Sequence, residues 1–177
     1  MRITGGYLRG RSFDGPAGHH VHPMGERIRS ALFNALGDIE GLSVLDAFAG
    51  SGAISLEAVS RGARVVTAIE KDHYAQDTIQ RNLEALDVTA SVKLVRANAA
   101  SWLTRSQETY DIVIADPPYS AIVDSLLALL SERLRPGGTA VLSLPPRYMF
   151  RLDPTIYALI TSKSYGDAEL HFYRRTR

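Results

Sequence analysis

The chain alternates short apolar runs with longer segments in which apolar residues recur at helical spacing. Apolar runs bounded by turn residues predict strands, and they fall at residues 43–47, 64–70, 92–96, 110–115 and 138–144. The helical spacing predicts helices near residues 53–61, 72–86, 99–104 and 121–134. Strands that alternate with helices favour an α/β fold with a mostly parallel sheet and right-handed crossovers. Ligands of such sheets bind at the carboxyl ends of the strands.

The N-terminal residues depart from this alternation. Glycines punctuate residues 2–13, which predicts a hairpin, and a polar loop over 14–24 leads into an amphipathic helix over 25–36. No repeat or interdomain linker is visible, so we expect a single domain over residues 1–177. Within it, residues 1–24 would form an arm and loop outside a core made of residues 25–177.

The C-terminal residues also predict strands. Residues 156–164 and 168–175 read as a final pair joined through Tyr165-Gly166-Asp167, which brings the predicted sheet to seven strands. A turn at Pro136-Gly137-Gly138 should launch the strand at 138–144.

The strand predicted at 110–115 runs directly into Asp116-Pro117-Pro118-Tyr119. Neither proline has an N–H and each fixes its own φ, so the strand must stop in a stiff turn. The first proline also keeps Asp116 out of the helical region. Such a turn presents one carboxylate, two free carbonyls and one aromatic ring. These groups can accept the hydrogens of a planar exocyclic amino group and stack on its ring, so we interpret the run as a base-modifying site.

A second candidate site follows the strand predicted at 43–47. There the run from Asp46 to Gly52 passes through small residues into a helix, so a ligand can approach the backbone at a helix N-terminus. The next strand ends at Glu70, whose carboxylate could accept hydrogen bonds from ribose hydroxyls. The structural alternatives are that Asp46 caps the following turn and that Glu70 is a solvated strand end.

Other nucleotide-binding motifs fit this loop less well. A dinucleotide fingerprint needs a third glycine where this chain has Ser55, and the Gly-Lys-Ser/Thr triplet of a P-loop is absent from the sequence. The Gly50-x-Gly52 pair alone could be a structural turn. Its specificity comes from the order in which it, Glu70 and the turn at Asp116 occur.

That order, Asp46-Ala47-Phe48-Ala49-Gly50-Ser51-Gly52, then Glu70, then Asp116-Pro117-Pro118-Tyr119, resembles Rossmann-like class I methyltransferases that depend on S-adenosyl-L-methionine (AdoMet). More narrowly, the whole chain resembles the RsmD family of bacterial 16S ribosomal RNA guanine-N2 methyltransferases. The segments behind this narrower resemblance are residues 2–11 and 26–36, with the closing Tyr165-Gly166 and His171-Phe172-Tyr173. One departure is His22-Pro23-Met24-Gly25, where the family usually shows an Arg-Pro-Thr-type run.

The resemblance implies a reaction and its residues. AdoMet would be the cofactor, and the substrate would be a guanine N2 amino group of 16S ribosomal RNA in a small ribosomal subunit or assembly intermediate, in the cytoplasm. The residues implied at the reaction centre are Asp116, Pro117, Pro118 and Tyr119. Those implied at the cofactor are Asp46, Phe48, Ala49, Gly50, Gly52, Glu70, Lys71, Asn98 and Ala99. An alternative for Asn98 is that it caps the next helix.

Charge adds a candidate RNA surface. Net charge is only +1, but arginine outnumbers lysine 17 to 3, and its planar fork suits phosphates and stacked bases. The N-terminal arm and the helix after it supply the candidates, with a solvated surface as the alternative. They are Arg2, Tyr7, Arg9, Arg11 and Arg27. Arg29 would either lie over the core or meet RNA phosphate or the cofactor carboxylate.

Composition excludes some chemistries. The chain has no cysteine, which rules out disulfides, iron–sulfur clusters and thiol catalysis. No apolar run approaches the ~20 residues of a membrane span, so no membrane role is expected. His19, His20 and His22 lie close together, but methyl transfer needs no metal, and we expect none.

Three other functions stay open on the sequence alone. The turn at Asp116 would serve an adenine-N6 methyltransferase equally well, because it grips any planar exocyclic amine. A non-catalytic RNA-binding or ribosome-assembly factor could retain the same fold. A small-amine methyltransferase is also open, although it would not need the arginine-rich arm.

Overall fold

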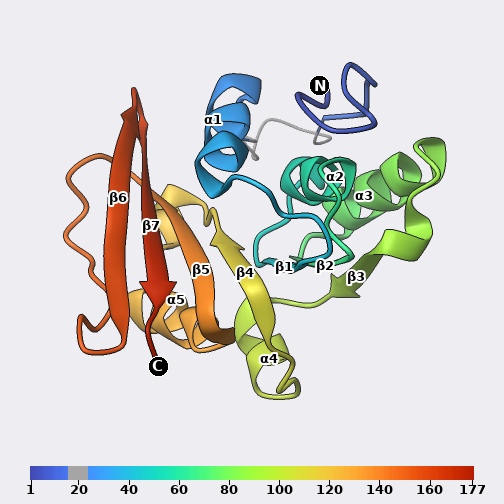
Figure 1. The fold of residues 1–177 in the computed structure, drawn as a ribbon. Coiled ribbons are helices and arrows are strands. Elements are labelled where there is room, and N and C mark those ends of the chain that lie inside the picture. The colour runs from blue at the N-terminus through green and yellow to red at the C-terminus, as the bar shows by residue number, and fades with distance from the viewer. Residues whose placement is uncertain (16–23) are drawn as a thin grey trace.

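The computed structural model describes residues 1–15 and 24–177 and is built on one seven-stranded sheet (Figure 1). The strand order is β3-β2-β1-β4-β5-β7-β6. The first five strands along the chain pair in parallel, whereas β7 is antiparallel to β5 and β6 is antiparallel to β7. Their bounds are β1 Ser43–Asp46, β2 Val65–Glu70, β3 Val92–Arg96, β4 Tyr110–Ala115, β5 Leu134–Leu144, β6 Tyr157–Tyr165 and β7 Ala168–Arg175.

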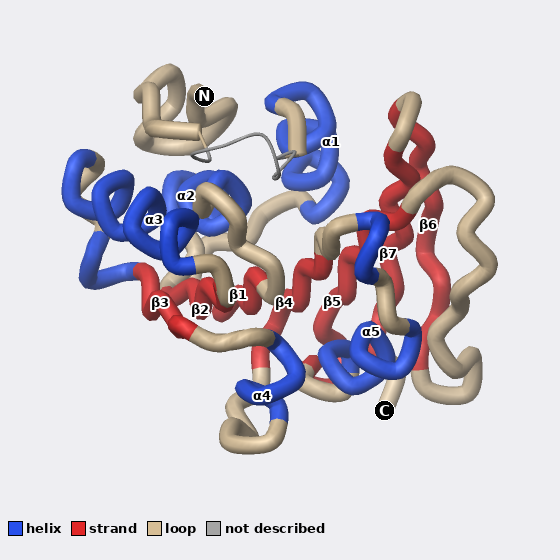
Figure 2. The backbone as a smooth tube through the Cα atoms, turned by 180° about the vertical axis from the view of Figure 1, so that it is seen from behind, coloured by secondary structure: helices blue, strands red, loops and turns tan. Residues whose placement is uncertain are grey.

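Helices cover both faces of the sheet, and each face has its own apolar core (Figures 1 and 2). One core packs α1 (Glu26–Leu36), α2 (Ala53–Ser60) and α3 (His73–Ala85) against the sheet. The other packs α4 (Ala99–Leu103) and α5 (Asp124–Ser131) against the opposite face. Short 3-10 turns lie at Thr89–Ser91 and Tyr119–Ala121. The prediction of an α/β fold with a seven-stranded, mostly parallel sheet is confirmed.

Two predicted boundaries were wrong, and proline explains both. The helix expected over 121–134 begins only at Asp124, because the chain leaves the two prolines through the turn at Tyr119–Ala121. Pro136-Gly137-Gly138 lies inside β5 rather than before it. There the pairing with β4 is irregular: Leu134 pairs with Tyr110, and Thr139 pairs with Ile112. The extra residues bulge out because proline has no N–H for the ladder.

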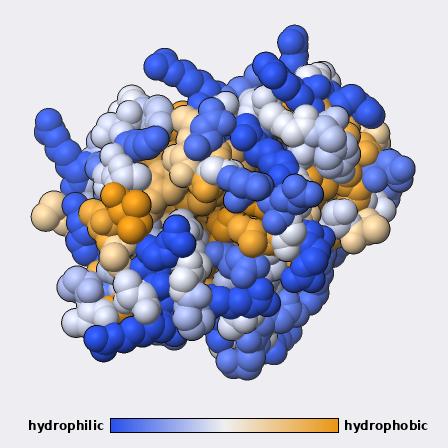
Figure 3. Space-filling view, in the orientation of Figure 1, coloured by the Kyte–Doolittle hydropathy of each residue, from blue (hydrophilic) through white to orange (hydrophobic). Residues whose placement is uncertain are grey.

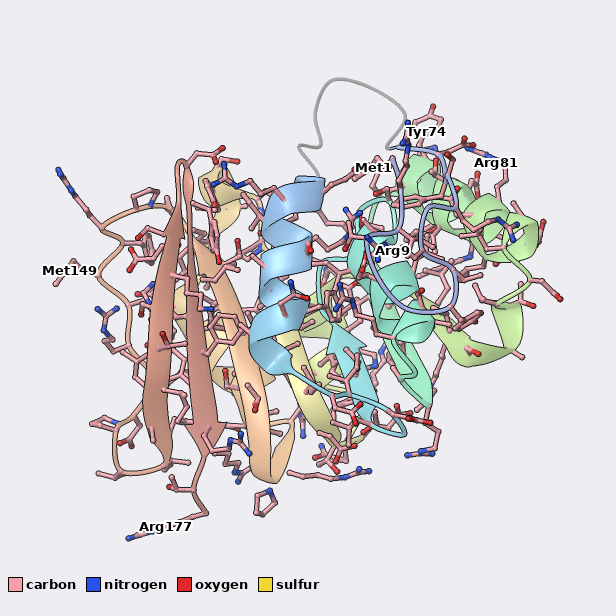
Figure 4. All side chains as sticks on the ribbon, turned by 45° about the horizontal axis from the view of Figure 1, so that its top comes forward. Met1, Arg9, Tyr74, Arg81, Met149 and Arg177 are labelled. Carbon is pink, nitrogen blue, oxygen red and sulfur yellow. The ribbon has the colours of Figure 1, made fainter. Side chains whose placement is uncertain are left out.

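The N-terminal residues 1–15 are docked onto the core, so the expectation of an arm outside it was wrong. The chain does fold back on itself, with one antiparallel bridge between Arg2 and Ser12. However, Ile3, Leu8 and Phe13 are at most 7% exposed and belong to the core that contains α2. All of α2 is buried, because this segment covers the side that the sheet does not. Figure 4 shows Arg9 where the segment crosses α2.

A buried carboxylate fastens this segment to two helices. Glu57 of α2 accepts hydrogen bonds from the Thr4 N–H at 2.9 Å and from the Thr4 hydroxyl at 2.6 Å. It also pairs with Arg29 of α1 at 3.1 Å and with Arg61 at 2.9 Å. Burial alone would raise the pKa of Glu57, but the bonds from Thr4, Arg61 and Arg29 outweigh it and lower that pKa. Arg29 is itself fully buried and paired with Glu57, so of its two alternatives the contact with RNA phosphate is excluded and the place at the core is favoured.

The surface is less covered at the β6 edge of the sheet. Leu159 and Ile160 of β6 are 44% and 60% exposed. Figure 3 shows apolar surface over the β6–β7 pair and again beside α1, framed by hydrophilic side chains. None of the helices described is both long and apolar enough to span a bilayer.

Candidate active site

The predicted site residues lie at the carboxyl edge of the sheet, where the strand order reverses. β1 sits between β2 and β4, and the Ala47 N–H donates to the Ile114 carbonyl at 3.0 Å, so the ends of β1 and β4 are joined. In open α/β sheets this reversal point forms the ligand crevice. Asp116 and the two prolines after it directly follow β4, and the glycine loop follows β1.

The glycine loop is held in a shape that side chains would not allow. Gly50 and Gly52 have φ values of +55° and +80°, in the left-handed region that favours glycine. The Ala49 N–H donates to the Ile69 carbonyl at 2.9 Å, and the Gly52 N–H donates to the Ala49 carbonyl at 2.7 Å. Gly52 then starts α2 with no side-chain cap. The N–H groups of Ala49 and Gly52 are thus used within the loop and sheet edge, whereas Gly52 offers no side chain to cap the first N–H groups of α2.

Glu70 ties this loop to the end of β2. Its carboxylate accepts hydrogen bonds from the N–H groups of Gly50, Lys71 and Asp72, each at 2.8 Å. An ionised carboxylate has about four acceptor sites, so about one remains for a ligand hydroxyl. Glu70 is therefore not a freely solvated strand end. Its carboxylate is held in place beside the glycine loop.

Asp46 lies beneath the loop and is only 1% exposed. It accepts a hydrogen bond from the Ser55 hydroxyl of α2 at 2.6 Å. Burial raises the pKa of Asp46 to about 7 against the lowering effect of Ser55, and the charges of Asp116 and Glu70 raise it further. Because β2, β1 and β4 are neighbours in the sheet, the three carboxylates at or just after their ends lie along one stretch of its carboxyl edge. Asp46 orders the loop from below, and because the Ser55 backbone also lowers its pKa, the alternative that Asp46 caps the first turn of α2 is kept.

In the Asp116-Pro117-Pro118-Tyr119 turn, some polar groups are already hydrogen-bonded within the turn and others are available to a ligand. The Pro118 carbonyl accepts from the Ala121 N–H at 2.8 Å, so only one of the two carbonyls expected to be free is available. Among the residues described, no backbone N–H donates to the Pro117 carbonyl. Tyr119 is 41% exposed, which leaves its ring open for stacking. The available groups are the Asp116 carboxylate, the Pro117 carbonyl and the Tyr119 ring.

Ser143, near the end of β5, stands beside two of these groups. Ala115 pairs with Leu142, which brings Asp116 next to Ser143 across the sheet. Burial raises the pKa of Asp116 to about 6, and the Ser143 hydroxyl opposes that rise. Burial also raises the pKa of Tyr119, again opposed by Ser143. Ser143 is 1% exposed and was missed by the sequence reading, because a serine inside an apolar strand carries no motif.

The remaining cofactor candidates surround the loop less directly. Asn98 caps α4, accepting from the Ser101 N–H at 2.7 Å, so its capping role is real, while its amide nitrogen stays exposed beside β3. Ala99 is buried in the α4 core, and Phe48 is half-buried against the same core. The Lys71 side chain is exposed, and only its backbone N–H reaches Glu70.

The candidate RNA residues are all on the surface. Tyr7 is 68% exposed, and the side chains of Arg2, Arg9, Arg11 and Arg27 are also exposed. Within the described part of the chain, none of these arginines forms an ion pair with a carboxylate. Arg11 makes one long contact, 3.4 Å, to the Ala85 carbonyl. Their charges are therefore available to a polyanion.

The described residues contain no cluster of three or more His, Cys, Asp or Glu side chains that could hold a metal ion. His19, His20 and His22 lie outside the residues that the structure describes.

The sheet order and the two loops at its carboxyl edge define the chain as a class I methyltransferase. The family described as "Conserved hypothetical protein 95" matches residues 1–174. The "Ribosomal RNA small subunit methyltransferase D" of Escherichia coli (strain K12) is 37% identical over 134 residues, which are 75% of this chain and 67% of that protein. The chain therefore belongs to this family, the RsmD family of methyltransferases.

Two further comparisons bear on fold and substrate. The solved structure of yhhF from Escherichia coli has a TM-score of 0.88 and 32% identity, covering 99% of this chain and 98% of its own. A "tRNA1(Val) (adenine(37)-N6)-methyltransferase" of Shewanella loihica is 28% identical over 137 residues, which are 64% of this chain and 56% of that protein.

Proposed function

We propose that this protein transfers the methyl group of AdoMet to the exocyclic N2 amino group of a guanine in 16S ribosomal RNA. Membership of the RsmD family supports methylation of small-subunit ribosomal RNA. The observation that carries the choice of an amino group is the turn after β4. It offers two acceptors, the Asp116 carboxylate and the Pro117 carbonyl, beside an open aromatic ring. The substrate would be a small ribosomal subunit or assembly intermediate, which would place the reaction in the cytoplasm.

The residues around the glycine loop fit AdoMet. The positive φ angles of Gly50 and Gly52 let a ligand approach the backbone, and the remaining acceptor site of Glu70 suits a ribose hydroxyl. Asp46 fixes the loop from below, with Phe48 and Ala49 beside it, and Lys71, Asn98 and Ala99 border the ends of β2 and β3. When bound there, AdoMet supplies an activated methyl group.

The turn at Asp116 would bind the target base and orient its amino group for methyl transfer. The Asp116 carboxylate and the Pro117 carbonyl accept the two amino hydrogens, which favours a more tetrahedral nitrogen with its lone pair free of the ring. Tyr119 stacks on the extruded base, a contact worth roughly 1–3 kcal/mol. Asp116 also stabilises the positive charge that develops on nitrogen, in a site where burial strengthens electrostatic interactions. Much of the rate would come from holding the nitrogen in position.

Removing the Asp116 carboxylate tests this assignment. Asp116→Ala should lower kcat on ribosomal RNA by about 10²-fold or more, with RNA and AdoMet binding little changed. Asp153→Ala is the matched control, because Asp153 is an exposed carboxylate that precedes β6 at the opposite edge of the sheet. Full turnover in the Asp116 variant would refute the catalytic assignment.

The second candidate is adenine-N6 methylation. The similarity to a transfer-RNA adenine-N6 methyltransferase favours keeping it, because the same acceptors would grip the adenine amino group. The product nucleoside distinguishes the two.

A further inference from the structure

A groove opens between α1 and the tip of the β6–β7 hairpin. Its volume is about 480 Å³, within the usual range for ligand sites. One wall is the start of α1, from Gly25 to Ile28, and the other is Ser164, Tyr165 and Gly166. The sequence reading used Tyr165 and Gly166 only as marks of the family, and the reaction assigned to the turn at Asp116 does not need them.

The groove lies at the same edge of the sheet as the reaction centre. β7 is antiparallel to β5, and Leu144 at the end of β5 pairs with Glu169 near the start of β7. The hairpin tip therefore stands beside the carboxyl end of β5, on the side toward which β4 points (Figure 1). The tip at Gly166 and Asp167 and the turn that follows β4 therefore lie at one edge of the sheet, and the charge of Asp167 adds to burial and Asp116 in raising the pKa of Tyr119.

The order of strands places the groove across the catalytic turn from the glycine loop. Along the sheet, β2 and β1 carry that loop and Glu70, β4 carries the turn, and β7 and β6 carry the groove. An in-line displacement needs the attacking nitrogen and the methyl donor on opposite sides of the reacting methyl group. The side of β5, β7 and β6 is therefore the side from which a substrate strand would arrive.

The groove has the chemistry to hold a nucleotide. Arg27 is exposed, and its guanidinium makes no hydrogen bond or ion pair with any residue described. The half-buried Tyr165 presents an aromatic ring in the opposite wall. Gly25 and Gly166 have no side chain, and a Cβ at either would meet no atom of the described residues within 4 Å. An aromatic platform, a free guanidinium and bare backbone match the way proteins bind single-stranded RNA.

The acidic side chain of the α1 wall is engaged outside the groove. The Arg2 N–H donates to the Glu26 carboxylate at 2.7 Å, which turns this acidic group toward the N-terminal segment. Repulsion of a phosphate by Glu26 is thereby reduced.

We propose that this groove binds the nucleotide adjoining the target base on the same RNA strand, with the Tyr165 ring against the base and the Arg27 guanidinium against the phosphate. The proposal rests on the function proposed above. It makes Tyr165 a substrate-binding residue that acts before the chemical step, because a flipped base can enter the turn at Asp116 only if its neighbours are held in place.

Kinetics on small ribosomal subunits that lack the modification test the groove. Tyr165→Leu should raise KM for the subunit roughly tenfold, leave kcat within about twofold and leave AdoMet affinity unchanged. Tyr165→Phe keeps the ring and should behave like the wild type. Arg27→Ala should also raise KM, and Arg105→Ala is its charge control, because this exposed arginine follows α4 and lies outside both walls.

A second variant fills the groove without removing anything. Gly25 has φ −60° and ψ 153°, so a large side chain fits its backbone, and Gly25→Trp should raise KM at least as much as Tyr165→Leu. Unchanged KM in both variants would overturn the proposal, and so would a loss of kcat at constant KM. If the wild type methylates no RNA at all, the proposed function is wrong. If the wild type is active and the variants keep its KM, only the role proposed for the groove is wrong.

Discussion

At the scale of single residues, the account depends on a buried carboxylate that must be ionised. Burial raises the pKa of Asp116 to about 6, and a hydrogen bond from the Ser143 hydroxyl limits this rise. Protonated Asp116 would lose acceptor capacity for the amino hydrogens. Single-turnover rates at saturating AdoMet should therefore fall about tenfold per pH unit below pH 6 and level off above it.

Ser143→Ala gives this pH profile a sharper test. Without the hydroxyl that lowers the pKa of Asp116, the midpoint should move above pH 6. A midpoint near pH 4 in the wild type, or no movement in the variant, would contradict the assignment. AdoMet binding, followed over the same range, separates this titration from that of Asp46, whose pKa is about 7.

Residues with local signatures were predictable, and residues defined by contacts between distant elements were not. The two prolines predict a stiff turn after β4, and the positive φ angles of Gly50 and Gly52 show that the small-residue run after β1 is a turn that requires glycine. Nothing local marks Ser143, which matters only because β5 pairs with β4. The Pro118 carbonyl was expected to be free, but the turn after it uses that carbonyl.

At the scale of elements, the decisive feature is the packing of the N-terminal segment on α2. Sequence predicts the apolar face of a helix from its spacing, yet α2 is buried all round and has no polar face to show. Its outer side is covered by residues 1–15, and the contact is fixed by Glu57 and Thr4, which are 53 positions apart. Removing residues 1–13 would therefore disturb folding as well as RNA binding, so point variants are the better probes.

Breaking the buried ion pair should destabilise the protein. Glu57→Gln leaves the buried Arg29 guanidinium without its charged partner, and we expect a loss of about 3–5 kcal/mol in the free energy of unfolding. Urea unfolding at pH 7 measures it. Asp77→Asn is the matched control, because its pair with Arg96 at 3.3 Å is exposed and should be worth less than about 1 kcal/mol. Equal effects of the two variants would contradict the role given to Glu57.

At the scale of the whole molecule, the sheet order places the candidate site and the groove along one edge. The glycine loop and Glu70 follow β1 and β2, the turn at Asp116 follows β4, and the groove lies between the tip of the β6–β7 hairpin and α1. The alternation of strands and helices predicted the sheet, because each apolar strand must be buried between helices on its two faces. It could not predict the groove, which exists only where α1 and a hairpin from the other end of the chain meet.

The central claim is that this protein methylates a guanine N2 amino group in small-subunit ribosomal RNA. The most direct measurement incubates the protein and labelled AdoMet with small ribosomal subunits from cells that lack it, followed by nucleoside mass spectrometry. We predict N2-methylguanosine at one site, abolished by Asp116→Ala. N6-methyladenosine, or no labelled nucleoside although AdoMet binds, would contradict the account.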